Sequence, residues 1–173
     1  MITIISATNR PYSNTLKVAQ NYAQLMEKQG VECKVLSLES LPPDFILTDL
    51  YSKRSENFQQ LLSEYIAPVQ KFVFVIPEYN GSFPGILKTF IDAVPPDINR
   101  GKKVAMIGVS SGRAGNLRGM EHMTGILNYL GMFVHPNKQP VSGILGLLHE
   151  NGSIKDEMTI KILEKHIDDV LKW

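Results

Sequence analysis

The sequence predicts an α/β protein in which helices cover both faces of a parallel sheet, and three observations lead to this fold class. Apolar runs typical of strands begin at five positions, Ile2, Val31, Phe72, Val104 and Phe133. The segments between these runs are long enough to form helices, and such alternation is typical of parallel sheets. Residues 72–76 and 104–109 are apolar throughout, as expected for strands buried on both faces.

The second run should lie at an edge of the sheet. Residues 31–35 read VECKV, in which apolar and polar side chains alternate as in a strand with one face in solvent. Five strands with the second at an edge fit the flavodoxin-like order 2-1-3-4-5. With 173 residues, 43% of them hydrophobic, one core is sufficient. We therefore expect a single domain over residues 1–173, a three-layer sandwich with a five-stranded parallel sheet.

Helix signals separate the first three runs. Residues 16–26 place apolar side chains three and four positions apart, and Gly30 follows as an expected helix stop. Ser55 is the expected N-cap of a helix that runs to about residue 66. The connection from Ser40 to Arg54 contains two adjacent prolines and mixed polarity, which predicts a long irregular segment whose role the sequence leaves open.

Further helices are expected after the third run. Ser82 is a candidate N-cap with Pro84 in the first turn, and two prolines at 95–96 end that helix. Apolar side chains at helical spacing predict two more helices, over residues 117–130 and 154–171.

Composition excludes several classes of protein. The chain has 18 basic and 17 acidic residues without a long charge run, so neither nucleic acid nor a membrane surface is an expected partner. A single cysteine, Cys33, excludes an internal disulfide, and the four histidines lack the spacing of a metal site. No apolar stretch approaches the roughly 20 residues of a membrane span, and no signal peptide is evident, so we expect a cytoplasmic protein.

A cluster of hydrogen-bond donors follows the first strand, in the segment ATNRPYSNT at residues 7–15. Backbone N–H groups at the start of the next helix, together with the helix dipole, favour an anion there. Side chains of this first loop can surround phosphate oxygens. The candidates are Thr8, Arg10, Ser13, Asn14 and Thr15. Simple capping of the helix by Ser13 or Asn14 is the alternative explanation.

Two more polar loops follow buried strands, PEYNGS at residues 77–82 and SSGRAGN at residues 110–116. Ligands of open α/β sheets bind outside the carboxyl ends of the strands, so the three loops should converge. Gly81 and Gly112 allow the backbone to approach a flat heteroaromatic ring. Neither G-x-x-x-x-G-K-[ST] nor G-x-G-x-x-G is present, which favours a mononucleotide over a nucleoside triphosphate or a resident dinucleotide.

The segments ATNRPYSNT, PEYNGSFPGILKTFID and GVSSGRAGN together resemble the NADPH-dependent FMN reductase family, which includes quinone, azo-dye and chromate reductases of flavodoxin-like fold. The resemblance covers nearly the whole chain, and PEYN with its following proline and LK is the most specific part. Ala7 and Thr8 stand where the family usually has glycine and serine, and Asn116 where a second glycine is frequent.

The resemblance implies roles for the three loops. The five first-loop candidates named above would hold the FMN phosphate. The residues expected to line the isoalloxazine ring are Pro77, Glu78, Tyr79, Asn80 and Gly81. The residues expected to border its other edge are Ser110, Ser111 and Gly112.

The implied function is that of an FMN-dependent NAD(P)H oxidoreductase. Hydride would pass from nicotinamide to the flavin, and electrons then to a quinone, an azo compound, a metal oxyanion or free flavin. Because the flavin supplies the chemistry, no catalytic side chain is expected. The resemblance also implies a homodimer or a dimer of dimers. The acceptor and the choice between NADH and NADPH stay open, with Arg113 and Arg118 as candidates for a 2′-phosphate.

Two other functions remain as alternatives. The run GVSSG, from Gly108 to Gly112, matches the G-x-S-x-G elbow of serine hydrolases, and Asp156 and His166 follow in the required chain order. Both, however, fall in or beside the last expected helix. A flavodoxin-like electron carrier is the second alternative, although such carriers tend to be strongly acidic and this chain has a net charge of +1.

Overall fold

A parallel sheet forms the middle layer of the molecule, for which a computed structural model describes residues 1–51 and 53–173. Its strands are β1 (Ile2–Ser6), β2 (Cys33–Ser37), β3 (Lys71–Pro77), β4 (Lys103–Val109), β5 (Phe133–Val134) and β6 (Gln139–Val141). The strand order is β2-β1-β3-β4-β5, and every pair is parallel. This confirms the predicted flavodoxin-like order.

The fifth strand position is filled by two short strands. Both β5 and β6 pair with β4, at Lys103↔Phe133 and further along at Ile107↔Gln139. Between them, the ring Nδ1 of His135 accepts a hydrogen bond from the backbone N–H of Asn137, 3.2 Å away, which bends the chain. The one strand expected from Phe133 onward is therefore divided.

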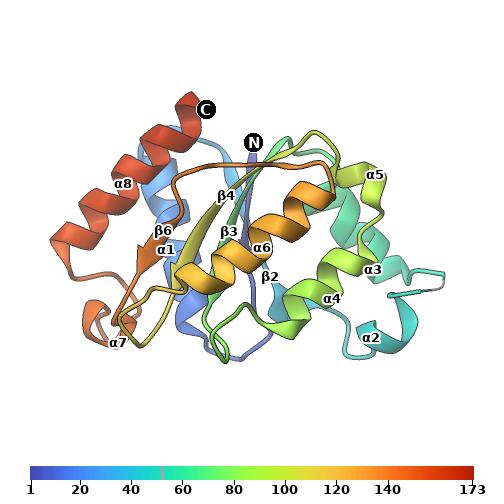
Figure 1. The fold of residues 1–173 in the computed structure, drawn as a ribbon, viewed down its shortest axis with the longest axis horizontal. Helices are drawn as coiled ribbons and strands as arrows, with labels where there is room; N and C mark the ends of the chain where they lie inside the picture. The colour runs from blue at the N-terminus through green and yellow to red at the C-terminus, as the bar shows by residue number, and fades with distance from the viewer. Residues whose placement is uncertain (52) are drawn as a thin grey trace.

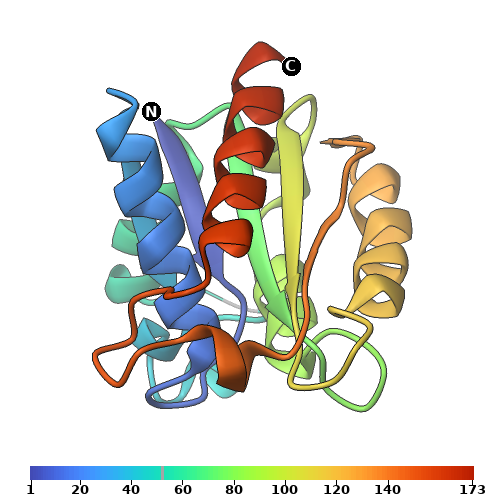
Figure 2. The same cartoon turned by 90° about the vertical axis from the view of Figure 1, so that its left-hand side faces the viewer.

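Helices cover both faces of this sheet, with α1 and α8 on one side and α3, α4 and α6 on the other (Figure 1). Their bounds are α1 (Asn14–Lys28), α2 (Phe45–Thr48), α3 (Glu56–Leu61), α4 (Gly85–Ala93), α5 (Pro96–Asn99), α6 (Leu117–Tyr129), α7 (Ile144–Leu147) and α8 (Glu157–Lys172). Two shorter helical turns are η1 (Leu38–Ser40) and η2 (Leu62–Ile66). Figure 2 shows both termini at the edge of the sheet opposite the carboxyl ends of the strands. Within the described part of the chain, no helix is long and apolar enough to cross a membrane.

Most of the predicted helix boundaries are confirmed. Gly30 follows α1 with a φ of 75°, a conformation that glycine adopts readily. The Ser55 hydroxyl caps α3 by accepting from Phe58 N–H at 3.2 Å, and η2 extends this helix to Ile66. The prediction that Ser82 caps α4 is wrong, because Pro84 occupies the N-cap position and the backbone of Ser82 closes a preceding turn.

The connection from Ser40 to Arg54 is less irregular than expected, since it contains α2; residue 52 lies outside the described residues. The buried carboxylate of Asp49, directly after α2, holds the end of this connection in place. It accepts hydrogen bonds from the backbone N–H of Ser55 at 2.5 Å and from the Thr48 hydroxyl at 2.8 Å. This connection is therefore anchored to the start of α3.

Asn116 ties the carboxyl end of β3 to the loop that follows β4. Its side-chain amide donates to the backbone carbonyls of Ile76, at 3.0 Å, and Pro77, at 2.9 Å. The residue is fully buried and has a φ of 59°, which asparagine tolerates better than most residues. Without the amide, the carbonyls of Ile76 and Pro77 would each lose a hydrogen bond that links β3 to this loop.

A buried tyrosine–histidine pair joins the two helices on the other face of the sheet. The Tyr22 hydroxyl on α1 lies 2.9 Å from Nδ1 of His166 on α8, and both side chains are fully buried. Burial and, to a smaller extent, the neighbouring His135 ring 6.2 Å away lower the pKa of His166 to about 4, although Asn137 and Asp169 oppose the shift. His166 is therefore neutral in the folded protein at pH 7.

We expect acid to destabilise the fold through His166. Below pH 6.5 the unfolded chain binds a proton that the folded protein does not bind until about pH 4. Stability should fall by about 3 kcal/mol across that window. Urea unfolding between pH 7.5 and pH 4.5 measures this loss. His166→Asn should flatten the profile, whereas the exposed His149→Asn should not; an unaltered profile in His166→Asn would contradict the assignment.

We also expect Asn116 to contribute strongly to stability. Asn116→Gly keeps the backbone conformation but removes the amide that donates to the Ile76 and Pro77 carbonyls, which should cost about 2 to 4 kcal/mol. Asn116→Ala should cost more, because alanine is strained at this φ. Chemical denaturation measures both values. The control is Asn128→Ala on the exposed side of α6, and equal stability of all three variants would show that the amide is not needed.

Candidate functional site

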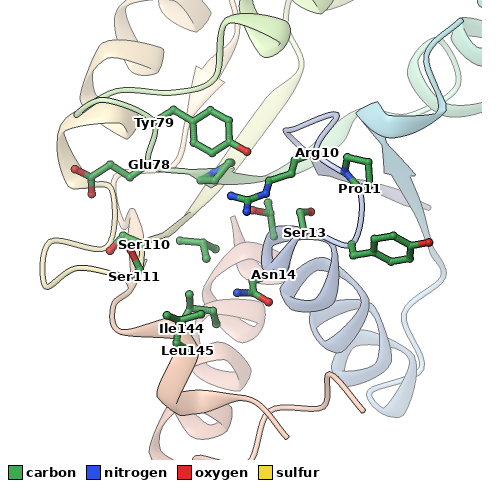
Figure 3. A pocket seen from close by; sticks show the side chains of 14 residues that line it. Arg10, Pro11, Ser13, Asn14, Glu78, Tyr79, Ser110, Ser111, Ile144 and Leu145 are labelled. Atoms are coloured by element: carbon green, nitrogen blue, oxygen red, sulfur yellow. The ribbon is translucent and has the colours of Figure 1, made fainter. Parts of the chain in front are cut away.

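The carboxyl ends of β1, β3 and β4 open onto one cleft of about 510 Å³ (Figure 3). Its walls come from four segments, residues 10–15, 77–79, 109–111 and 144–145. The first three belong to the three loops that were expected to converge, and the structure brings them together. The fourth segment follows β6 and was not predicted.

The first loop presents unpaired donors at the start of α1. The Ser13 hydroxyl caps the helix by accepting from Leu16 N–H at 3.1 Å, so its own proton can still be donated. Within the described part of the chain, the backbone N–H groups of Asn14 and Thr15 have no acceptor. Together with the helix dipole, these groups form a site for an anion.

Arg10 adds a positive charge to the same end of the cleft. Its side chain reaches across the cavity, whereas Glu78 points away from it (Figure 3). No acidic partner for Arg10 is found among residues 1–51 and 53–173. An unpaired guanidinium beside free N–H groups is suited to binding a phosphate.

Thr8 is placed beneath this wall of the cleft and is fully buried. Its hydroxyl oxygen accepts from the backbone N–H of Arg10 at 3.2 Å and lies 3.0 Å from the Tyr79 hydroxyl oxygen. Thr8 is not among the residues that line the cleft, and its predicted contact with a phosphate stays a prediction.

The second loop ends in a tight two-residue turn. Tyr79 and Ser82 exchange backbone hydrogen bonds at 2.9 and 3.0 Å, and the residues between them, Asn80 and Gly81, have φ values of 51° and 74°. Positive φ at both central positions is the requirement of a type I′ hairpin turn, for which Asn-Gly is the preferred pair. Asn80 and Gly81 thus form the turn and lie outside the lining of the cleft, which ends at Tyr79.

The third loop is closed by Ser110. Its hydroxyl donates to the carbonyl of Gly112 at 2.9 Å and accepts from Gly115 N–H at 3.0 Å. The backbone N–H groups of Ser111 and Gly112 have no acceptor in the described chain, and that of Ser111 lies in the wall of the cleft. Ser110 and Ser111 line the cleft, whereas Gly112 does not.

The hydrolase alternative is not supported by this geometry. The Ser110 hydroxyl is engaged within its own loop, His166 bonds to Tyr22, and Asp156 caps α8 by accepting from Thr159. Gly108 is required for close packing, because a Cβ there would lie 2.0 Å from the carbonyl oxygen of Gly115. The packing of the third loop against β4 therefore accounts for the first glycine of the G-x-S-x-G match, and the Ser110 hydroxyl accounts for the loop closure.

The fourth wall is held by hydrogen bonds to the third loop. Gly143 N–H donates to the Gly112 carbonyl at 2.9 Å, and Ile144 N–H donates to the Ser110 carbonyl at 3.1 Å. Leu145 lines the cleft while 72% exposed. The apolar run GILGLL was visible in the sequence, but it is too short to indicate which surface it covers.

The cleft can bind a ligand with an anionic end and a flat polar ring. The anion fits the donors at α1, and the free N–H groups of the third loop fit the ring. No group of three or more His, Cys, Asp or Glu side chains that could hold a metal ion occurs among the described residues.

Comparisons with known proteins agree with this arrangement. Residues 1–144 match the family model described as NADPH-dependent FMN reductase. The chain is 28% identical over 150 residues to an NAD(P)H-dependent FMN reductase of Pseudomonas aeruginosa, covering 83% of this chain and 79% of that protein. It is 31% identical over 115 residues to a 2-hydroxy-1,4-benzoquinone reductase of a Burkholderia species, covering 64% and 63%.

A solved structure is similar over nearly the full length. FerB, a flavoenzyme NAD(P)H:(acceptor) oxidoreductase from Paracoccus denitrificans, has a TM-score of 0.80 and 26% identity, with 99% of this chain and 95% of that chain covered. The match to residues 1–144 includes the first three walls of the cleft and reaches Ile144 in the fourth. The chain belongs to the NADPH-dependent FMN reductase family, and it is an enzyme of the NAD(P)H-dependent flavin and quinone reductase type.

Proposed function

We propose that this protein binds FMN in the cleft and transfers electrons from NAD(P)H to a small acceptor. The observation that supports this most strongly is the meeting of free donors at α1 with the two other loops in one cavity. Quinones are the acceptor class we expect first, since one relative is a quinone reductase. Azo compounds, metal oxyanions and free flavin would approach the same exposed ring.

The phosphate of FMN would lie at the start of α1. Arg10 supplies the charge, Ser13 and Thr15 supply hydroxyl groups, and the backbone N–H groups of Asn14 and Thr15 point outward there. These donors suit a dianionic monophosphate, because each phosphate oxygen can accept several hydrogen bonds.

The ring would lie between the second and third loops. Pro77, Glu78 and Tyr79 form one side, and Ser110 and Ser111 form the other. When bound, the flavin supplies hydride and electron transfer, which no side chain of the protein could provide. The protein would position the ring and would leave one face open to solvent for nicotinamide and acceptor.

We also propose that two copies associate through the surface between α4 and α6. A hollow of about 300 Å³ there is lined in part by Ile91, Ile126 and Leu130, and Tyr129 beside it is 90% exposed. Apolar side chains gathered on one surface favour association between proteins. This supports the homodimer, or dimer of dimers, that the family resemblance implies.

The flavin assignment predicts that the apo protein binds FMN and that Arg10→Ala weakens this binding by roughly ten- to a hundredfold. The reason is the loss of charge-assisted hydrogen bonds to the phosphate, each of which contributes about 1.5 to 3 kcal/mol. Quenching of FMN fluorescence measures the affinity. Arg100→Ala, on the exposed segment after α5, is the control and should bind as the wild type does.

Bound FMN should lose its visible absorbance when NADH or NADPH is added without oxygen. Failure of the wild-type protein to bind FMN would overturn the flavin assignment. Binding of FMN without reduction by either nicotinamide would instead favour an electron carrier.

Steady-state kinetics should follow a ping-pong pattern with NAD(P)H and a benzoquinone. One exposed face must serve both molecules in turn, and the chain has no dinucleotide fingerprint that would retain the nicotinamide. Parallel double-reciprocal lines are expected. Intersecting lines would show a ternary complex and contradict the shared face.

A further inference from the structure

Tyr79 belongs to the second loop, but its hydroxyl reaches the first loop. The hydroxyl oxygen lies 3.0 Å from Thr8 Oγ1, across 71 positions of sequence. The hydroxyl end of the ring is directed toward Arg10 at the anion-binding end of the cleft (Figure 3). Its position therefore differs from that expected of a residue that contacts only the isoalloxazine ring.

The burial of Thr8 determines which of these two hydroxyl groups donates. Thr8 Oγ1 already accepts from Arg10 N–H at 3.2 Å, and the side chain is fully shielded from water. Within the described residues, the Tyr79 oxygen is the one acceptor available for the Thr8 proton. A buried hydroxyl without an acceptor costs free energy, so Thr8 donates and Tyr79 accepts.

The proton of Tyr79 is consequently left for a ligand. Its ring lines the cleft, and no other partner of its hydroxyl is found in the described chain. A hydroxyl that accepts a hydrogen bond is polarised and becomes a better donor itself. The nearest part of the cleft is the anion-binding end, where Arg10 and the first turn of α1 lie.

We propose that the Tyr79 hydroxyl donates a hydrogen bond to the phosphate of FMN and that Thr8 is the positioning residue that orients it. This inference rests on the proposed function. It gives Tyr79 a role at the phosphate in place of the ring contact expected from the sequence, and it gives Thr8 an indirect role. The second loop would then contribute to both ends of the flavin.

The test compares two ligands that differ only in the phosphate. The affinities of the apo protein for FMN and for riboflavin are measured by fluorescence quenching. Tyr79→Phe should weaken FMN binding roughly tenfold, because a hydrogen bond to a charged group is lost, and should change riboflavin binding less than twofold. Tyr51→Phe, at an exposed tyrosine in the connection from Ser40 to Arg54, is the matched control and should change neither affinity.

Variants of Thr8 test the positioning role. Thr8→Val removes the hydroxyl with little change in shape and should weaken FMN binding several-fold, again without affecting riboflavin. Thr8→Ser retains the hydroxyl and should restore the affinity of the wild type. The double variant Thr8→Val, Tyr79→Phe should bind FMN about as Tyr79→Phe does, since both changes remove one interaction. Thermal unfolding of each apo protein confirms that the fold is retained.

Three results would overturn the inference. An equal loss of FMN and riboflavin affinity in Tyr79→Phe would place the hydroxyl at the ring. Unchanged FMN affinity in Tyr79→Phe would mean that Tyr79 donates to Thr8. Additive effects in the double variant would show that the two residues act separately. The proposed function and the inference fail by different results. If the wild-type protein binds neither flavin, the proposed function fails; if it binds FMN but the variants give one of the three results above, only the inference fails.

Discussion

The parallel pairing of β1, β3 and β4 is the constraint on which the cleft depends. Strands that run in one direction end at one edge of the sheet, so the loops that follow them share a rim even though they are far apart in sequence. The register aligns Ser6 with Val75 and Pro77 with Val109, which brings the first residues of the three loops to similar heights. A slip of one residue would turn each side chain at this rim to the opposite face.

Side-chain hydrogen bonds hold the loops of the cleft together and leave several backbone N–H groups free. The Asn116 side chain donates hydrogen bonds to the carbonyls at the end of β3. The Ser110 hydroxyl bonds to two backbone groups within the third loop. Among the residues that the structure describes, the cleft-lining backbone N–H groups of Asn14, Thr15 and Ser111 have no protein acceptor. Free N–H groups that face a concave surface can donate hydrogen bonds to a ligand there.

Two features that suggested other chemistry have structural explanations. The first glycine of the GVSSG run, Gly108, is needed because the backbone of Gly115 approaches it too closely for a side chain. His166, the potential base of a hydrolase, is buried against Tyr22 between α1 and α8. Burial keeps it neutral at pH 7 and links acid stability to the packing of α1 against α8, outside the lining of the cleft.

The sequence by itself determined the strand order and the loops that form the cleft, because buried strands, alternating edge strands and glycine-containing turns are local patterns. It misplaced the cap of α4, since the Asn80-Gly81 turn takes up Ser82. Only the tertiary structure decided that Thr8 bonds to Tyr79 and that Leu145 forms a fourth wall. These contacts join residues separated by long stretches of chain, and their existence depends on sheet register and burial, which no local pattern encodes.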